Sequence, residues 1–264
     1  MFWTRLHAIT ILPAFALFII LAVLITRLLK NKSERIQYIP FQIIACTLLV
    51  LEVLKQINSI DFETGTYNTY SLPFHYCSLF LYLFPLHAFY KGKHKSIIDA
   101  ITFACGSSLT LFMLVIPTIV YGESSILEFT QNFSSFHTVI FHNLAMFYVI
   151  LMLAMRMHKT STRADLAPTT VFLAIYVIIA AILSNTLKVN FHNLYQCNLA
   201  PIESIRQILI EKIGYAGGQM IYTVVMFIGT ILFAYIAYFA ARFVMYLIDK
   251  IFFRRPNREI SKVT

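Results

Sequence analysis

Apolar residues occur along this chain in seven long runs that are separated by shorter polar segments. A helix needs about 20 apolar residues to cross the hydrocarbon core of a bilayer, and each run is near that length. The pattern predicts an all-α polytopic bundle of about seven transmembrane helices, forming a single domain over residues 1–264. The predicted spans lie near 6–29, 38–57, 72–90, 96–116, 136–157, 168–188 and 217–248.

The longest connection, residues 189–216, has a pattern of its own. From Pro201 onward its apolar residues recur at helical spacing, at Ile202, Ile205, Leu209 and Ile213. This spacing predicts an extracytoplasmic loop with a short helix lying in the membrane interface. A simple connector without a function of its own is the alternative.

Basic residues fall in alternate connections between the spans. Lys and Arg gather around residues 27–35, 91–95 and 156–163 and in the tail from Lys250, whereas 58–71 and 117–135 contain none. The positive-inside rule therefore predicts an outer N-terminus and a cytoplasmic C-terminus. We expect a multi-pass integral protein of the cell membrane.

Composition agrees with this prediction and excludes several function classes. The 264 residues are 59% hydrophobic and 12% charged, with a mean hydropathy of +0.73. Soluble domains carry about 25% charged residues. The net charge of +9 does not indicate nucleic-acid binding, because the basic residues lie in short loop clusters. No nucleotide-binding loop is present, so we predict membrane lipids as partners, with no nucleic acid, nucleotide or cofactor.

The stretch from Leu72 to Ser78 reads Leu-Pro-Phe-His-Tyr-Cys-Ser and opens the third predicted span. Ser71 can cap a helix and a proline is tolerated in a first turn, so we expect the helix to begin here. Ionisable groups inside a membrane are costly and raise a functional hypothesis. For each residue alone a structural role stays open: His75 could bond a nearby carbonyl, and Cys77 could pack as a small hydrophobe.

Polar residues of several spans gather in the outer leaflet, as estimated from about 1.5 Å of rise per helical residue. Cys77 and His142 lie at nearly the same predicted depth, His75 and His137 lie nearer the surface, and His192 lies in a loop. The whole set comprises Glu52, Lys55, His75, Cys77, His137, His142, Asn185, His192 and Gln219. Glu52 and Lys55 are spaced to pair on one helical face. A shared cavity satisfies such groups at lower cost than separate burial in lipid, so the pattern predicts an outer-leaflet pocket.

Cys77 and His142 lie on different spans at matching depth and form the best candidate for a nucleophilic pair. A thiol surrounded by lipid needs a neighbouring histidine to remove its proton. No two outer histidines have the i,i+4 spacing of a ready-made metal site, so we predict none. A metal-dependent hydrolase that uses these histidines and Glu52 stays a third hypothesis.

The same residues carry a family resemblance. Leu72–Cys77 resembles the LPLHLC signature of the YwaF-like bacterial integral membrane proteins, and Phe136–His142 resembles their second signature, two histidines five residues apart. The region Asn185–Asn190 is similar to a third landmark, and together the similarities cover most of the chain. A eukaryotic relative of that family is an ether-phospholipid acyltransferase that uses a cysteine and a histidine. Androgen-induced membrane hydrolases of fatty esters are more remote relatives.

The resemblance implies Cys77 as nucleophile and His142 as general base, with His75 and His137 as neighbours. Asn143 stands where the bacterial motif usually has glycine, which could crowd or orient His142. The leading hypothesis is an integral membrane enzyme acting on lipid acyl esters, as an acyltransferase or a hydrolase.

This hypothesis requires groups that stabilise the developing oxyanion, and a different class of protein stays open. Asn143, Asn185 or Gln219 could donate hydrogen bonds to the developing oxyanion. The alternative is a non-catalytic transporter or lipid-binding receptor that uses the same pocket.

Overall fold

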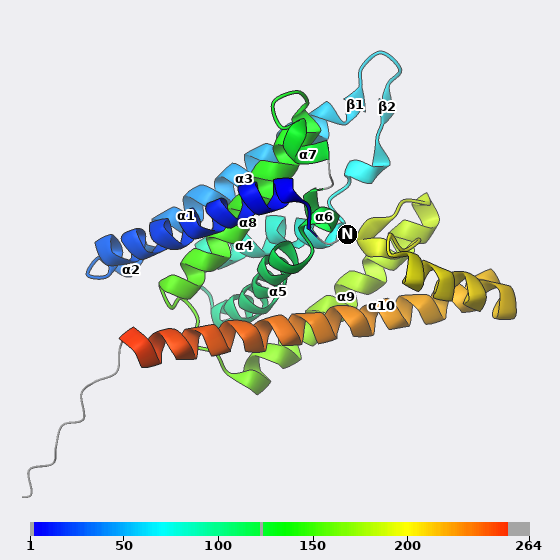
Figure 1. Cartoon of the computed structure of the whole chain (residues 1–264). Helices are drawn as coiled ribbons and strands as arrows, with labels where there is room; N and C mark the ends of the chain where they lie inside the picture. The colour runs from blue at the N-terminus through cyan, green and yellow to red at the C-terminus, as the bar shows by residue number, and fades with distance from the viewer. Residues whose placement is uncertain (1–2, 122–123, 253–264) are drawn as a thin grey trace, which may run out of the picture.

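The computed structural model describes residues 3–121 and 124–252, and helices make up most of this part of the chain (Figure 1). Six described helices are long and apolar enough to cross a membrane. They are α1 (Arg5–Leu29), α3 (Ile39–Asn58) with the one-turn α2 (Glu34–Gln37) before it, α5 (Lys95–Val115), α8 (Phe133–Ala154), α9 (Thr162–Leu187) and α10 (Ala200–Phe252). The predicted all-α membrane bundle is confirmed, while the orientation of its ends stays a prediction.

Helix α5 forms the centre of the bundle and packs against α4, α8, α9 and α10. Small residues permit this close packing: a Cβ placed on Gly106 would lie 2.6 Å from a methyl group of Val149 on α8. Helix α1 packs against α8 at the edge of the bundle and buries only His7, Ile11 and Ala22. The core therefore lies around α5, and most of α1 is left to face lipid.

The third predicted span is shorter than its apolar run. Its helical part is the 3₁₀ turn η2 (Tyr76–Leu79) followed by α4 (Phe80–Phe89). Leu72 has φ −55° and ψ 140°, the extended conformation that a following proline imposes. The helix thus begins at Tyr76 rather than near Ser71, and the residues before it form an extended segment.

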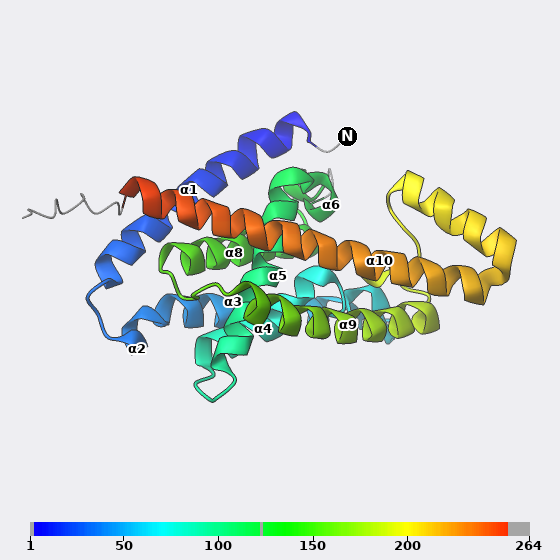
Figure 2. The ribbon, with the colours of Figure 1, turned by 90° about the horizontal axis from the view of Figure 1, so that it is seen from below.

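Helix α10 consists of two helices joined by a sharp reversal at Gly214, whose φ of 77° and ψ of 164° are not helical. Figure 2 shows the first part, Ala200–Ile213, folded back along the start of the second part, which continues beside α9. A Cβ on Gly218 would lie 2.7 Å from the backbone nitrogen of Ile210, so the two parts meet at backbone distance. We call Ala200–Ile213 the return helix.

Short elements close one end of the bundle. They are the hairpin β1 (Ile60–Asp61) with β2 (Thr66–Tyr67), the turn η1 (Thr69–Ser71), α6 (Pro117–Tyr121), α7 (Ser124–Leu127) and η3 (Phe191–Asn193). The strands pair antiparallel, with Ile60 opposite Tyr67. The connections rich in Lys and Arg lie at the opposite end, and the basic tail beyond residue 252 lies outside the described residues.

Candidate functional site

A cavity of about 850 Å³ opens at the end of the bundle that carries the hairpin and the short turns. Ligand sites for small molecules typically measure about 300–1,000 Å³. Its walls come from α3, the extended segment before η2, α5, α8, the loop around η3 and α10. Seven of the residues predicted for an outer pocket line it together: Glu52, Lys55, His75, Cys77, His137, His142 and His192.

Three hydrogen bonds hold the extended segment that carries His75. The Tyr176 hydroxyl of α9 donates to the Phe74 carbonyl at 2.7 Å, and the Gln56 amide of α3 donates to the Ser71 carbonyl at 2.9 Å. His75 bonds the Tyr70 carbonyl through Nε2 at 3.0 Å. These backbone carbonyls accept hydrogen bonds from side chains instead of from helical N–H groups. They are therefore satisfied although the segment is not helical.

Glu52 gathers the charged side of the cavity. Its carboxylate lies 2.9 Å from the Lys55 ammonium, as the i,i+3 spacing predicted, and 3.4 Å from Nε2 of His137 on α8. Gln56 also donates a hydrogen bond to it. The Glu52 side chain is only 11% exposed, so its charge is matched by cationic and polar partners rather than by bulk water.

His142 is held in one orientation by its own helix. Its Nδ1 lies 2.7 Å from the Thr138 carbonyl oxygen. A carbonyl can only accept, so in the neutral imidazole Nδ1 carries the proton and Nε2 is the nitrogen able to accept one. This tautomer of His142 is the one that a general base needs. Cys77 is half-buried and lines the same cavity.

His192 lies in the left-handed region at φ 51°, as does Asn193 at φ 55°. Such backbone conformations are uncommon outside glycine and persist where the surroundings hold them. Nε2 of His192 is 2.9 Å from the Thr230 hydroxyl, which itself donates to the Met226 carbonyl. Burial, and then the charge of His75, lower the pKa of His192 to about 4, so this loop presents a neutral imidazole at neutral pH.

None of the three amides predicted for the oxyanion belongs to the cavity lining. Asn143 donates to the Tyr121 hydroxyl at 3.1 Å and to its own helix. Asn185 donates to the Ala181 carbonyl and accepts from Tyr215. Gln219 donates to the Leu194 carbonyl at 2.6 Å. Each amide is already bonded to another part of the fold.

Sequence reasoning missed part of the polar lining. The cavity also includes Asp61, Tyr70, Tyr76, Ser78, Ser134, Thr138, Asn190, Asn193, Cys197 and Asn198. A dense run of asparagines from 190 to 198 was the available signal for the loop. Tyr76 and Asp61 carried none, because their positions depend on the late start of α4 and on the hairpin.

Part of the cavity wall is apolar. Leu109 and Phe112 contribute to it from α5, and Met226 and Phe233 contribute from α10. The cavity is therefore amphipathic, with ionisable groups on α3 and α8 and apolar side chains on α5 and α10. Within residues 3–121 and 124–252, no group of three or more His, Cys, Asp or Glu side chains is placed to hold a metal ion.

Fold and cavity together define a multi-pass helical membrane protein with an amphipathic chamber at one end of its bundle. A model of the TMEM164 family, a family of membrane proteins, matches residues 2–239, and the chain belongs to that family. No curated protein and no solved structure matches the chain.

Proposed function

We propose that this protein is an enzyme of the cell membrane that acts on lipid acyl esters from the outer leaflet. The observation that supports this most directly is a single cavity that contains Cys77, the oriented imidazole of His142, a charged cluster and an apolar wall. A lipid ester has a matching set of parts: a polar head for the charged cluster, a reactive carbonyl for Cys77 and His142, and hydrocarbon tails for the apolar wall.

The chemistry follows from these groups. Nε2 of His142 removes the thiol proton of Cys77, and the thiolate attacks the ester carbonyl carbon. The tetrahedral intermediate collapses to a thioester when the ester C–O bond breaks, and the proton passes from His142 to the departing lipid alkoxide. In the second half, water or another lipid hydroxyl gives its proton to His142 and attacks the thioester. The acid or the new ester leaves, and the proton returns to the Cys77 thiolate.

The charged cluster supports a lipid headgroup in this proposal. Lys55 supplies the positive charge for a phosphate, and the Glu52 carboxylate keeps Lys55 and His137 at the cavity wall. The three predicted amides are bonded elsewhere, so the oxyanion needs another donor of the cavity wall, such as the Tyr70 hydroxyl.

Acyl-enzyme trapping tests the proposal. We expect purified protein given a phospholipid with a labelled acyl chain to carry that label on Cys77 as a hydroxylamine-sensitive thioester. His142→Gln should slow formation of the thioester about 10²- to 10⁴-fold, the usual contribution of a general base. Cys105 is buried away from the cavity lining, so Cys105→Ala serves as the matched control and should retain the label.

Cys197 sharpens this experiment because it is a second thiol in the same cavity. Label on Cys77 but not on Cys197 indicates activation rather than access alone. Equal labelling of both thiols, or labelling of Cys77 that ignores His142→Gln, would contradict the proposal. Lipid binding that survives Cys77→Ala without any acyl turnover in the wild type would favour a transporter or lipid-binding receptor instead.

A further inference from the structure

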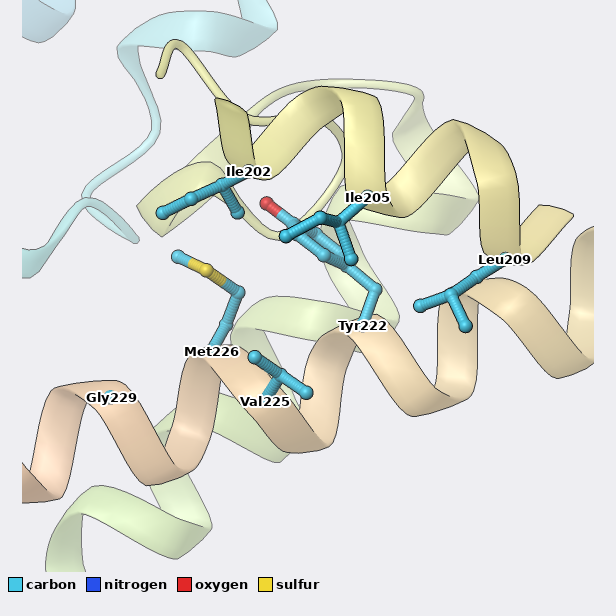
Figure 3. A pocket seen from close by; sticks show the side chains of 7 residues that line it. All are labelled: Ile202, Ile205, Leu209, Tyr222, Val225, Met226 and Gly229. Atoms are coloured by element: carbon cyan, nitrogen blue, oxygen red, sulfur yellow. The ribbon is translucent and has the colours of Figure 1, made fainter. Parts of the chain in front are cut away.

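The return helix and the start of the last span enclose an apolar groove. Ile202, Ile205 and Leu209 line it from the return helix, and Tyr222, Val225, Met226 and Gly229 line it from the span (Figure 3). Its volume is about 180 Å³. The close-up shows these side chains converging from the two facing helices onto one slot.

We infer that this groove holds one fatty acyl chain of a lipid whose polar end lies in the cavity. The inference rests on the proposed function for the class of occupant. Its own evidence is continuity: Ile202, Met226 and Gly229 line both the groove and the cavity. The groove is thus an apolar extension of a cavity whose wall also carries ionisable groups.

Polar contacts at the base of the return helix keep the groove open. Arg206, buried at 7% exposure, donates to the Gln219 side chain at 3.1 Å and pairs with Glu203. Glu203 also accepts from the backbone N–H of Cys197 at 2.8 Å. These bonds join the return helix to the last span and to the loop that contains Cys197, a residue of the cavity lining. The groove therefore exists before any lipid enters it.

The outer side of the groove is open. Ile205 and Val225 line the slot and are still 57% and 52% exposed. A membrane span leaves such apolar surface to lipid. A chain can therefore enter sideways from the bilayer while its headgroup enters the cavity.

Gly229 lies at the junction between the groove and the cavity, because it lines both. A Cβ at this position would meet no atom within 4 Å, so a larger side chain fits without moving the backbone. Such a side chain would occupy space that the groove and the cavity share. Substitutions at Gly229 should therefore shorten the acyl chain that the site accepts while leaving the fold intact.

Photo-crosslinking in the full-length Cys77→Ala protein tests this without any dependence on catalysis. The protein is reconstituted in phosphatidylcholine vesicles that contain a trace of phosphatidylcholine with a diazirine near one acyl end. We expect crosslinks on Leu209 and Val225. Gly229→Phe should lower them at least about tenfold, because several methylenes of the acyl chain lose their burial. Gly229→Leu should give a smaller decrease.

Ile228→Phe is the matched control, because Ile228 is the 50% exposed neighbour of Gly229 and lies outside the lining of both spaces. It should leave the crosslinks unchanged. Equal yields in the two Phe variants would show that bulk lipid fills the groove independently of the cavity, which overturns the inference. Absence of a thioester in the wild type, with Gly229-dependent crosslinks retained, would reject the proposed enzyme but not the groove.

Discussion

Single buried side chains stabilise the bundle at the end opposite the cavity, and Asp165 of α9 is the clearest case. It is 2% exposed and accepts hydrogen bonds from the Tyr238 hydroxyl at 2.6 Å and the Ser161 backbone N–H at 2.7 Å. Nε2 of His158 lies 3.0 Å from the same carboxylate. One residue thus joins α9 to α10 and to the connection that follows α8.

We expect Asp165→Ala to lower the free energy of unfolding by about 3–5 kcal/mol, the usual cost of removing one member of a buried ionic network. Three polar partners would lose their acceptor in an apolar setting. Thermal unfolding in detergent measures the change. Asp249→Ala is the control: its 57% exposed carboxylate pairs with Arg156 at 2.6 Å, and its loss should cost less than about 1 kcal/mol. Similar shifts for both variants would contradict this account.

At the same scale, the candidate site shows what the sequence could and could not predict. The i,i+3 spacing of Glu52 and Lys55 was sufficient to predict their contact, because helical geometry alone places them side by side. The approach of His137 to Glu52 was not predictable in detail, since it depends on how α8 is rotated against α3. The amides of Asn143, Asn185 and Gln219 bond to groups outside the cavity lining, and the depth of these residues in the membrane stays a prediction.

Among the elements, the two-part α10 departs most from its hydrophobic pattern. The apolar spacing of Ile202, Ile205 and Leu209 predicted a helix, and the structure has one there. The same spacing did not predict that this helix folds back against the last span. The reversal depends on the backbone conformation of Gly214 and on the absence of a side chain at Gly218. The late start of α4 has a similar local cause, the conformation that Pro73 imposes on Leu72.

We predict that Gly214→Ala and Gly218→Ala each destabilise the return helix. Gly214 has a φ of 77°, where a Cβ introduces strain of about 1–3 kcal/mol. At Gly218 a Cβ would lie 2.7 Å from the Ile210 backbone and force the two parts of α10 apart. Hydrogen exchange of residues 200–213 in reconstituted protein should rise in both variants.

Gly229→Ala provides the comparison for those two substitutions. It lies in the same helix with open space around it, so it should leave exchange of the return helix unchanged. If all three alanine variants exchange alike, the reversal at Gly214 and the close contact at Gly218 do not hold the return helix in place.

For the whole molecule, the cavity and the connections rich in Lys and Arg lie at opposite ends of the bundle. The hairpin, η1 and η3 surround the cavity, whereas the connections between α4 and α5 and between α8 and α9 carry the Lys and Arg clusters. The alternation of charge along the sequence predicted this division, because successive spans must end on opposite sides. Which helices enclose a cavity depends on side-chain packing across the bundle, and hydropathy carries no such information.

From the positive-inside rule we predict that the basic end faces the cytoplasm and that the cavity opens to the outside. Single cysteines at two exposed positions test that orientation, Glu63→Cys in the β1–β2 connection and Lys93→Cys between α4 and α5. On intact cells, a membrane-impermeant maleimide should label Glu63→Cys above the unsubstituted chain and should reach Lys93→Cys only after permeabilisation. The reverse pattern would place Cys77 and His142 at the cytoplasmic leaflet. The proposed lipid substrate would then have to come from that leaflet, and the acyl-chain groove would open to it on the same side.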